Sequence, residues 1–379
     1  MKAFVLKGHA DVGFIEKKEP SLESRGGVLL RPVVVSPCTS DVHTVWQGSP
    51  KKKDLTLGHE CVAQVVEAGE DVKDFSKGDI VAVPAITPDW DQADVDINPS
   101  HAGHNFSAHM LGKSIDGAFQ ELFYLPHADK NLALVPDGVT LEQALMCVDV
   151  VSTGFTAVEE GNVKSGDTVV VMGIGGIGLA AIMGCRLRHA ARIFAVGSRP
   201  ENVRIAEDLG AEVLNYKTIQ CGLPEGMHPL ANSTNSAVVN YVLEKTKTKG
   251  ADEVLICGGS DLSFPQAVDM VKYGTGTVSN VMYYGASDSE HENGIDSLQI
   301  PKFSIGRGMA GKTLKFSLAK GGRKRIEYLL SLCQQGKIHP EVLITKRYDG
   351  LENIEQALYD MKDRKAIKIA VTCSHVGHI

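Results

Sequence analysis

The first part of the chain alternates short apolar runs with turn residues. Runs rich in Val, Leu and Ile cover residues 27–35, 61–66 and 79–84, and turn residues such as Gly, Pro, Ser or Asp lie at or near their ends. Such runs are typical of β-strands, and residues 1–6 have the same character. We therefore expect a β-rich, barrel-like domain that continues until a helical pattern begins near residue 141.

From residue 168 the chain alternates between strand-like and helix-like segments. This alternation predicts βαβ units and a parallel sheet. The expected strands are 168–172, 192–196, 213–214, 253–257 and 276–283, and the expected helices are 177–188 and 200–209.

Beyond about residue 296 the pattern returns to mixed helix and strand, with a helix at 323–334 and a closing strand at 367–372. We expect this last part to rejoin the first domain. The prediction is thus an α/β protein of two domains, one formed by residues 1–152 and 296–379 and the other by residues 153–295.

The composition is that of an ordinary soluble, ordered protein and adds little to the prediction. The net charge of −7 comes without a basic run, so nucleic acid and anionic membranes are not expected partners. Residues 323–325 are basic and are interpreted as a solvated helix face. The eight cysteines are scattered, which indicates a reducing compartment such as the cytoplasm. No export signal is expected, because residues 1–6 lack a continuous apolar segment and a cleavage site and are interpreted as a first strand. No membrane span is expected either, because the most apolar run, 168–185, contains five glycines.

A glycine pattern follows the first predicted strand of the alternating part. Gly173, Gly175 and Gly178 complete a GxGxxG motif between a strand and a helix, where glycines allow a tight turn and a close approach of backbone to a pyrophosphate. The bland alternative is a glycine-rich turn. We predict a dinucleotide cradle formed by Gly173, Gly175, Gly176, Ile177 and Gly178.

The end of the next strand indicates which dinucleotide binds. An NAD-specific domain usually carries a carboxylate there for the ribose 2′-hydroxyl, whereas this chain reads Gly-Ser-Arg-Pro at 197–200. The Ser198 hydroxyl and the Arg199 guanidinium suit a 2′-phosphate. We therefore predict NADP(H); the alternative is that Arg199 is a solvated residue at a helix start beside Pro200.

Two segments of the first domain have metal-ligand character. Cys38 opens a Cys-Thr-Ser-Asp-Val-His run, and Gly58-His59-Glu60 follows twenty residues after it. A catalytic zinc takes three protein ligands from Cys, His and carboxylate and leaves a position for water or substrate. Cys38 and His59 fit two of these three.

These motifs give the chain its resemblance to a known family. The sequence resembles the zinc-dependent medium-chain alcohol dehydrogenases over nearly its whole length, and among them the NADP-dependent secondary alcohol dehydrogenases. The resemblance implies a GroES-like catalytic domain, a Rossmann domain with a doubly wound parallel sheet, one catalytic zinc and NADP(H). The segments that carry it, besides the metal and ribose motifs, are 83–90, 116–119, 149–154 and the stretch around Lys368.

The resemblance also completes the metal set. The family ligand three residues before the Ser-Thr-Gly triplet is Asp149 here, where most relatives have cysteine, and Cys147 is the rival ligand. One thiolate, one imidazole and one carboxylate balance a divalent cation as two thiolates and an imidazole would. Glu60 is expected in the open position when substrate is absent, or otherwise around the ligands, and Asp41 is expected to orient His59.

The same resemblance assigns further roles. Ser40 and His43 are expected to relay the proton, with zinc as the Lewis acid for hydride transfer. Thr153 and Lys368 are expected near the nicotinamide and its ribose, and Tyr216 near the adenosine phosphate. The expected substrate pocket is Ala85, Ile86 and Trp90, for which core packing is the ordinary alternative.

A structural zinc is not expected, because the region 89–116 has no cysteine. His101, His104 and His109 in that region are interpreted as surface residues. Two departures from the family pattern leave the identity of the substrate undecided. Ala63 stands where the family usually has glycine, and Arg307 lies in a segment that is near the pocket in the subgroup.

The expected reaction moves a hydride between NADP(H) and a short secondary alcohol or ketone, with aldehydes as possible substrates. A polyol or diol dehydrogenase and a non-catalytic NADP-binding protein are the alternatives. The resemblance alone implies a homotetramer.

Overall fold

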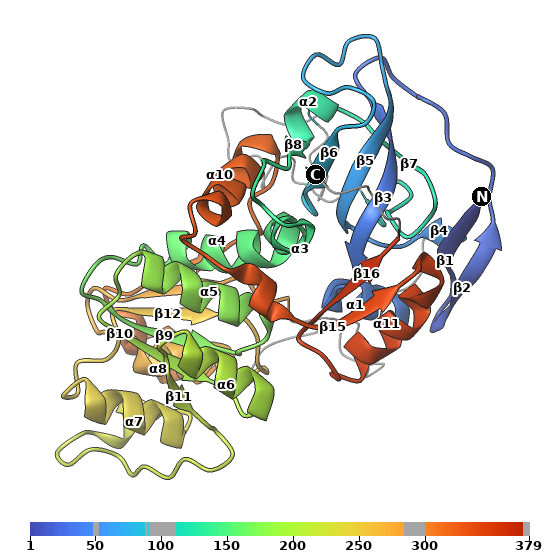
Figure 1. Cartoon of the computed structure of the whole chain (residues 1–379). Helices are drawn as coiled ribbons and strands as arrows, with labels where there is room; N and C mark the ends of the chain where they lie inside the picture. Colours follow the sequence, from blue (N-terminus) through green and yellow to red (C-terminus); the bar gives the residue numbers. More distant parts are fainter. Residues whose placement is uncertain (48–52, 88–89, 91–110, 284–299, 374–379) are drawn as a thin grey trace. The chain divides into compact units, whose positions relative to one another are not determined.

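The computed structural model describes residues 1–47, 53–87, 90, 111–283 and 300–373. Two compact units account for the chain: Met1–Ser152 together with Ala319–Ile379, and Thr153–Leu318. Figure 1 shows their elements along the sequence.

The first unit is built mainly on antiparallel strands, and β15 and β16 form a parallel pair within it. Within the described residues, one sheet has the order β2-β1-β4, and a second has the order β15-β16-β3-β5-β6-β8 with β7 paired to β3. The strands are β1 (Lys2–Gly8), β2 (Asp11–Glu16), β3 (Val28–Ser36), β4 (Leu55–Thr56), β5 (Glu60–Ala68), β6 (Ile80–Val83), β7 (Phe123–Leu125), β8 (Ala133–Leu134), β15 (Ile344–Asp349) and β16 (Lys368–Thr372).

The core of this unit lies between the strands, where Phe4, Phe119 and Phe123 are fully buried. Its strands are buried over most of their length: eight of the nine residues of β3 and all four residues of β6 are buried. The helices of the unit are α1 (Thr39–Trp46), α2 (Ala128–Asn131), α3 (Leu141–Met146), α10 (Arg323–Gln334) and α11 (Ile354–Lys362), and a π-helical turn covers Cys147–Val151.

The second unit is a parallel sheet with helices. Its strand order is β11-β10-β9-β12-β13-β14, and every neighbouring pair is parallel. The strands are β9 (Thr168–Met172), β10 (Arg192–Val196), β11 (Glu212–Leu214), β12 (Glu253–Ile256), β13 (Thr277–Asn280) and β14 (Thr313–Phe316). The helices are α4 (Ser152–Glu160), α5 (Gly176–Leu187), α6 (Pro200–Asp208), α7 (Ala237–Lys245), α8 (Ser263–Met270) and α9 (Lys302–Ile305).

The order of strands reverses direction between β9 and β12. Open sheets of this kind bind ligands at the carboxyl ends of the strands beside such a switch point. The predicted α/β class, with one β-rich and one parallel-sheet domain, is confirmed. The sheet includes a strand, β14, that lies beyond the residue 296 at which the sequence placed the return to the first domain, and the second unit runs to Leu318.

Helix α3, the π-helical turn and α4 follow one another without a break. The whole run, Leu141–Glu160, is long and apolar enough to cross a membrane, but 83% of its apolar window is buried inside the protein. A run covered in this way has the character of a core helix.

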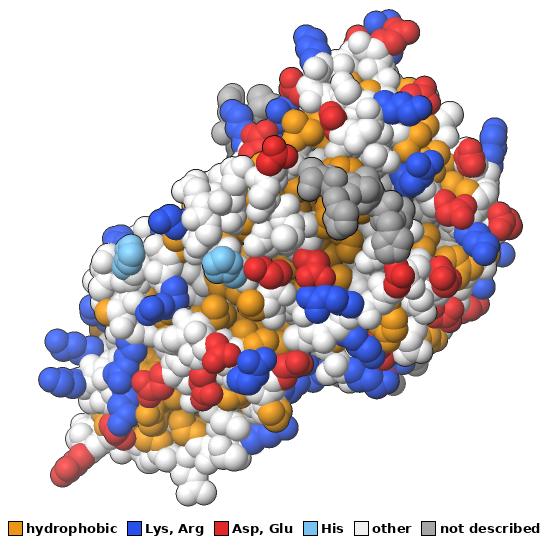
Figure 2. Space-filling model, in the orientation of Figure 1, with side chains coloured by type: hydrophobic (Ala, Val, Ile, Leu, Met, Phe, Trp, Pro, Cys, Tyr) orange, Lys and Arg blue, Asp and Glu red, His pale blue; other side chains and the backbone are white. Residues whose placement is uncertain are grey.

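Figure 2 shows acidic and basic side chains interspersed on the visible face.

Candidate functional site

Cys38 is placed by the start of α1. It is the N-cap residue, and its sulfur accepts a hydrogen bond from the Ser40 backbone N–H at 3.4 Å. Asp41 completes the cap, since its carboxylate accepts from the Cys38 N–H at 2.9 Å. A reciprocal cap of this type fixes the direction in which the chain enters a helix. The thiol is thereby held at a helix N-terminus, which favours negative charge on the sulfur.

His59 is placed by a tight turn and by Asp41. Gly58 before it has φ +96°, and a Cβ at that position would lie 2.4 Å from the Phe119 ring, so glycine is required. Nδ1 of the buried His59 ring lies 3.3 Å from Oδ1 of Asp41. This is the contact expected for Asp41. With the Nδ1 proton held by that carboxylate, Nε2 is the ring nitrogen that binds a metal once it has released its proton.

Asp149 lies in the π-helical turn Cys147–Val151. Its Oδ2 is 3.5 Å from the Cys38 sulfur and 3.9 Å from Nε2 of His59. π-Helical turns are rare and occur often at functional sites. Cys147, two residues earlier, is turned elsewhere, since its sulfur lies 3.6 Å from that of Cys333.

The three donors meet with a fourth, Glu60. Ligand atoms of Cys38, His59, Glu60 and Asp149 all lie within 4.8 Å of one another. Glu60 is fully buried at the start of β5 and pairs with the buried Lys368 of β16, Nζ to Oε2 at 2.6 Å. Lys368 also donates to the carbonyl of Pro37 at 3.2 Å. The sequence did not predict the pair of Glu60 and Lys368.

The protonation of these groups reflects a shortage of positive charge. Burial, together with the negative Glu60 and Asp149, raises the pKa of the Cys38 thiol. Burial and Asp149 raise the pKa of Glu60 to about 8 although Lys368 opposes the shift. Burial alone would lower the pKa of His59, but the charge and hydrogen bond of Asp41 raise it well above its usual value.

A divalent cation fits this donor set. The cation would offset the electrostatic repulsion between a thiolate and two carboxylates, because a bound cation is the largest local charge in such a site. One sulfur, one imidazole nitrogen and carboxylate oxygen are zinc ligands, and buried thiolate argues against the harder Mg²⁺ and Ca²⁺. The chemistry of these four donors therefore suits a zinc ion.

The two expected relay residues lie on α1. The Ser40 hydroxyl is 3.1 Å from Nε2 of His59, so it reaches the cluster directly. His43 lies one turn on, with its Nδ1 hydrogen-bonded to the side chain of Gln47. The structure thus brings Ser40 to the donors and leaves His43 partly exposed on the helix.

The expected pocket residues form a segment joined to the π-helical turn. Ala85 and Ile86 are buried, and the Ala85 N–H donates to the Val148 carbonyl at 3.0 Å. The indole N–H of Trp90 donates to Oδ1 of Asn131 at 2.8 Å. Thr87, which the sequence did not single out, is buried, and no hydrogen-bond partner for its hydroxyl lies among the described residues.

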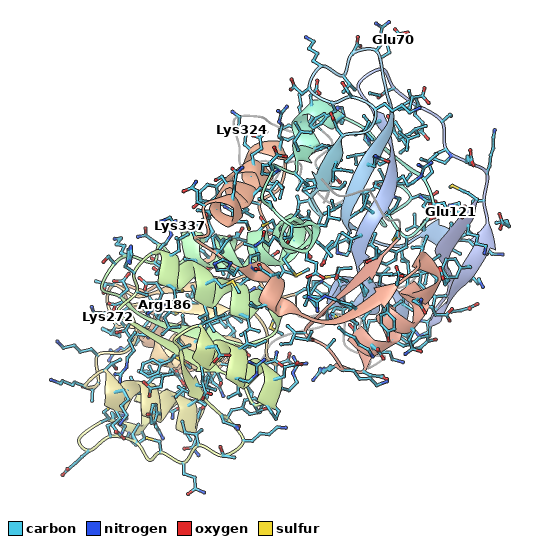
Figure 3. The ribbon with its side chains drawn as sticks, in the orientation of Figure 1. Glu70, Glu121, Arg186, Lys272, Lys324 and Lys337 are labelled. Carbon is cyan, nitrogen blue, oxygen red and sulfur yellow. The ribbon has the colours of Figure 1, made fainter. Side chains whose placement is uncertain are left out.

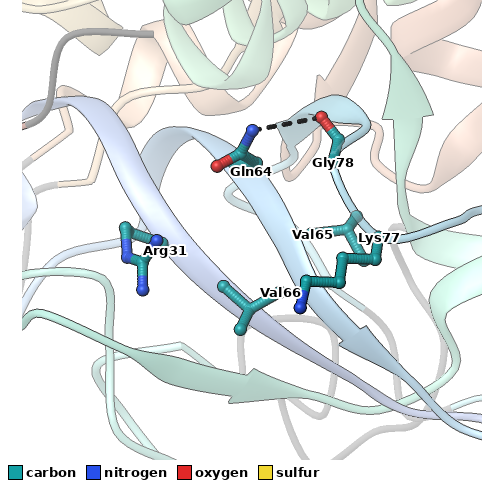
Figure 4. A pocket seen from close by; sticks show the side chains of 6 residues that line it. All are labelled: Arg31, Gln64, Val65, Val66, Lys77 and Gly78. Atoms are coloured by element: carbon teal, nitrogen blue, oxygen red, sulfur yellow. Dashed lines mark hydrogen bonds between the residues drawn. The ribbon is translucent and has the colours of Figure 1, made fainter.

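A surface hollow of about 210 Å³ lies elsewhere in the first unit. It is lined from β3, β5 and the turn before β6, as Figure 4 shows: Arg31, Gln64, Val65, Val66, Lys77 and Gly78. None of the four clustered donors lines it. Its lining residues include no Cys, His or carboxylate that could bind a metal.

The predicted cradle lies in the second unit at the switch point of its sheet. Gly173 has φ +81°, and a Cβ there would lie 2.5 Å from the Gly258 backbone that follows β12. A Cβ on Gly178 would lie 2.0 Å from the Gly173 carbonyl, whereas one on Gly175 would meet nothing within 4 Å. The first and third glycines serve packing, and the second leaves open space at the N-terminus of α5, where a pyrophosphate would sit.

Neighbouring strand ends carry the predicted ribose-phosphate residues. Ser198 and the exposed Arg199 follow β10, and Tyr216, 56% exposed, follows β11. Asn202 of α6 donates to the Ile174 carbonyl at 2.6 Å and so fixes the cradle loop, a contact that the sequence did not predict. The carboxyl ends of parallel strands thus bring these residues to the same edge of the sheet.

Comparison with known proteins decides the family. Residues 24–137 match the model of the alcohol dehydrogenase GroES-like domain, and residues 176–305 match that of the zinc-binding dehydrogenases. The NADP-dependent isopropanol dehydrogenase of Clostridium beijerinckii is 40% identical over 96% of this chain and 97% of its own length. The enzyme of the same description from Entamoeba histolytica is 41% identical over 97% and 93%. The chain belongs to the zinc-dependent alcohol dehydrogenase family.

Solved structures agree with this family. The alcohol dehydrogenase TADH from Thermus sp. ATN1 superposes with a TM-score of 0.81 at 26% identity, over 99% of this chain and 100% of that one. The GroES-like and Rossmann folds expected from the sequence are confirmed, and the protein is an oxidoreductase of the alcohol dehydrogenase family.

Two other predicted residues of this alcohol dehydrogenase belong to the second unit. Thr153 is buried at the first position of the second unit, and Arg307 is exposed in that unit. His101, His104 and His109 lie outside the described residues.

Proposed function

We propose that the protein is an NADP(H)-dependent secondary alcohol dehydrogenase with one catalytic zinc. Cys38, His59 and Asp149 hold the ion, and Glu60 takes the exchangeable position when substrate is absent. The observation that carries the proposal is the convergence of four donor atoms within 4.8 Å of one another, on the buried His59 and Glu60 and the partly buried Cys38 and Asp149. A protein that only binds a dinucleotide would have no need of this set.

The zinc, when bound, supplies a Lewis acid that lowers the pKa of an alcohol or polarises a ketone. The chain's residues do the rest. Asp41 fixes the tautomer and orientation of His59, and Lys368 pairs with the buried Glu60 and so opposes the rise in the pKa of that carboxyl. The Ser40 hydroxyl, 3.1 Å from the ligand imidazole, is the first member of a proton relay that His43 continues.

The proposed coenzyme is NADP(H), held by Gly173, Gly175, Gly176, Ile177 and Gly178 and, at the 2′-phosphate, by Ser198 and Arg199. Support comes from the open space at Gly175, from the lack of a carboxylate at residues 197–200, and from the two relatives described as NADP-dependent. Thr153, Lys368 and Tyr216 are proposed to contact the nicotinamide, its ribose and the adenosine phosphate.

The proposed substrates are short secondary alcohols and ketones. Ala85, Ile86 and Trp90 offer an apolar wall, which suits an aliphatic chain and excludes water. The two relatives described as isopropanol dehydrogenases support the same substrate class. We also propose that the enzyme is a cytoplasmic homotetramer without a structural zinc.

The test is a comparison of kcat/KM values. We expect kcat/KM to be higher for propan-2-ol than for butane-2,3-diol and sorbitol. In the reduction of acetone, we expect kcat/KM to be higher for NADPH than for NADH. Arg199→Ala should raise KM for NADPH about tenfold, as loss of a charge-assisted hydrogen bond does. Arg204→Ala, which removes an exposed arginine of the same helix, is the control. A preference for NADH would refute the coenzyme assignment, and a preference for the polyols would refute the substrate assignment.

A further inference from the structure

Helix α10 lies against both ends of the π-helical turn that carries Asp149. At the first end, the Cys333 sulfur lies 3.6 Å from that of Cys147. At the other end, Arg325 donates from Nε to the Ser152 hydroxyl at 3.0 Å and from a terminal nitrogen to the Ser152 carbonyl at 3.1 Å. One helix thus holds the turn at the residues that flank Asp149.

Ser152 joins two distant parts of the chain. It is the last residue of the first segment of its unit, is 1% exposed, and donates through its hydroxyl to the carbonyl of Lys320 at 2.5 Å. Lys320 is the second residue after the chain returns to this unit at Ala319. A single buried hydroxyl therefore ties the departing segment to the returning one, and Arg325 holds that hydroxyl.

The returning segment contacts the expected pocket residues. The Gly322 N–H donates to the Ile86 carbonyl at 3.3 Å, and a Cβ on Gly321 would lie 2.3 Å from the same oxygen. Ala85 in turn donates to the Val148 carbonyl at 3.0 Å, directly before Asp149. These contacts connect Val148, within the π-helical turn, through the pocket segment and the returning segment to Ser152, the residue directly after the turn.

We propose that Arg325 is a positioning residue for the metal ligand Asp149, acting through Ser152 on the π-helical turn. The inference rests on the proposed function, because it takes Asp149 as a zinc ligand. The sequence interpreted residues 323–325 as a solvated face. Lys324 is exposed and extends from α10 in Figure 3, whereas Arg325 is half-buried on the turn.

The physical reason lies in the shape of the turn. A π-helical turn lacks the regular ladder of an α-helix, so its geometry depends on partners outside it. The planar guanidinium, with two donors on one residue, is such a partner. Removing it leaves the buried Ser152 carbonyl and hydroxyl without those donors, which favours relaxation of the turn and a shift of the Asp149 carboxylate. Partners behind metal ligands commonly change metal affinity by 10–100-fold.

The experiment compares Arg325→Ala with Arg323→Ala in the full-length, zinc-loaded enzyme. Arg323 lies on the same helix but pairs with Glu327 and Asp74, away from the turn. Zinc affinity is measured by chelator competition, and melting temperature with and without zinc. We expect Arg325→Ala to weaken zinc binding about tenfold and to reduce the gain in melting temperature on adding zinc. Arg323→Ala should leave both unchanged.

Two further variants keep the outcome clear. Arg325→Lys retains the charge but cannot reach both Ser152 atoms, so its affinity should lie between those of wild type and Arg325→Ala. If Arg325→Ala does not fold, Ser152→Ala, which removes only the shared hydroxyl, should weaken zinc binding by a smaller factor. Zinc affinity within twofold of wild type in the folded variant that is measured would overturn the inference.

Asp149→Ala separates the two hypotheses. If it loses zinc while Arg325→Ala binds zinc like wild type, only the positioning role fails. If Asp149→Ala itself keeps wild-type affinity, the proposed ligand set fails, and the inference fails with it.

Discussion

The Ser40 hydroxyl has a position that its neighbours on α1 lack, since it lies 3.1 Å from Nε2 of His59. A proton that leaves the substrate oxygen has to pass a protic group close to the ligands, and Ser40 is suited to that step. Its role is therefore separable from zinc binding, because it contributes no ligand atom to the donor cluster.

Ser40→Ala should lower kcat about 100-fold, in line with loss of a proton-transfer group, and should change the pH dependence of kcat. Zinc content, measured by mass spectrometry of the metal, should stay at the wild-type value. Thr39→Ala alters the exposed residue beside it and is the control. Unchanged turnover and an unchanged pH profile in Ser40→Ala would remove the relay.

Sequence offers candidate site residues where they are neighbours in the chain. Cys38 and His59 come from two short motifs with metal-ligand character, and the roles of Asp41 and Asp149 came from the family resemblance. Lys368, by contrast, meets Glu60 across 308 positions, and no local pattern signals that contact. Arg325 looks like any basic residue of an amphipathic helix, and only tertiary packing reveals that it binds Ser152.

At the scale of elements, two glycines of the GxGxxG loop, three residues apart, have different roles: Gly178 is required for packing and Gly175 leaves room for the coenzyme. Gly178→Ala places a Cβ 2.0 Å from the Gly173 carbonyl, whereas Gly175→Ala places one in open space at a φ of −72° that any residue adopts. The two glycines are chemically equal, so they form a matched pair.

Gly178→Ala should destabilise the enzyme by about 2 kcal/mol or more, because backbone has to move. Gly175→Ala should change stability by less than about 0.5 kcal/mol and raise KM for NADPH at least tenfold, since its methyl group occupies the place of the pyrophosphate. Thermal denaturation and coenzyme titration measure the two effects. Wild-type coenzyme affinity in Gly175→Ala would contradict the cradle.

The first residue of β12 gives the parallel sheet a pH dependence. Burial, and then the neighbouring Asp167, raise the pKa of Glu253 to about 9. The folded protein therefore keeps this carboxyl protonated at pH values where the unfolded chain releases the proton. Stability from this group is complete below about pH 4.3 and is lost as the pH rises towards 9.

Glu253→Gln, which is neutral at every pH, should flatten the decline of stability between pH 5 and 9 and raise the melting temperature most at pH 8–9. The slope that it removes is at most about 1.4 kcal/mol per pH unit, the value for one proton. Glu212→Gln changes the first residue of β11, which is partly exposed and paired with Arg192, and serves as control. Equal pH slopes in Glu253→Gln and wild type would contradict the assignment.

Element prediction succeeded where periodicity was strong. The runs that became β3, β5, β9 and β10 and the helices α5 and α10 were predicted within a few residues. The π-helical turn was missed because its residues read as ordinary helix. Strand β14 was missed because its four residues, Thr-Leu-Lys-Phe, carry no buried apolar run and pair only through the sheet.

At the scale of the whole molecule, the donors and the glycine cradle belong to different units of the chain. The metal cluster lies entirely within the first unit, so metal binding can be tested without reference to the coenzyme. Hydride transfer requires both, and activity alone would not tell which one a variant has lost. Zinc content and activity have to be followed together.

The most direct test of the central claim follows zinc per chain and NADPH-dependent reduction of acetone during chelation and on re-addition of zinc, in wild type, Asp149→Ala and Cys147→Ala. The account predicts that wild type and Cys147→Ala hold zinc, lose activity in step with its removal and regain it when zinc is restored, while Asp149→Ala holds little zinc and shows little activity. Full activity in zinc-free wild type, or full zinc occupancy and activity in Asp149→Ala, would contradict it.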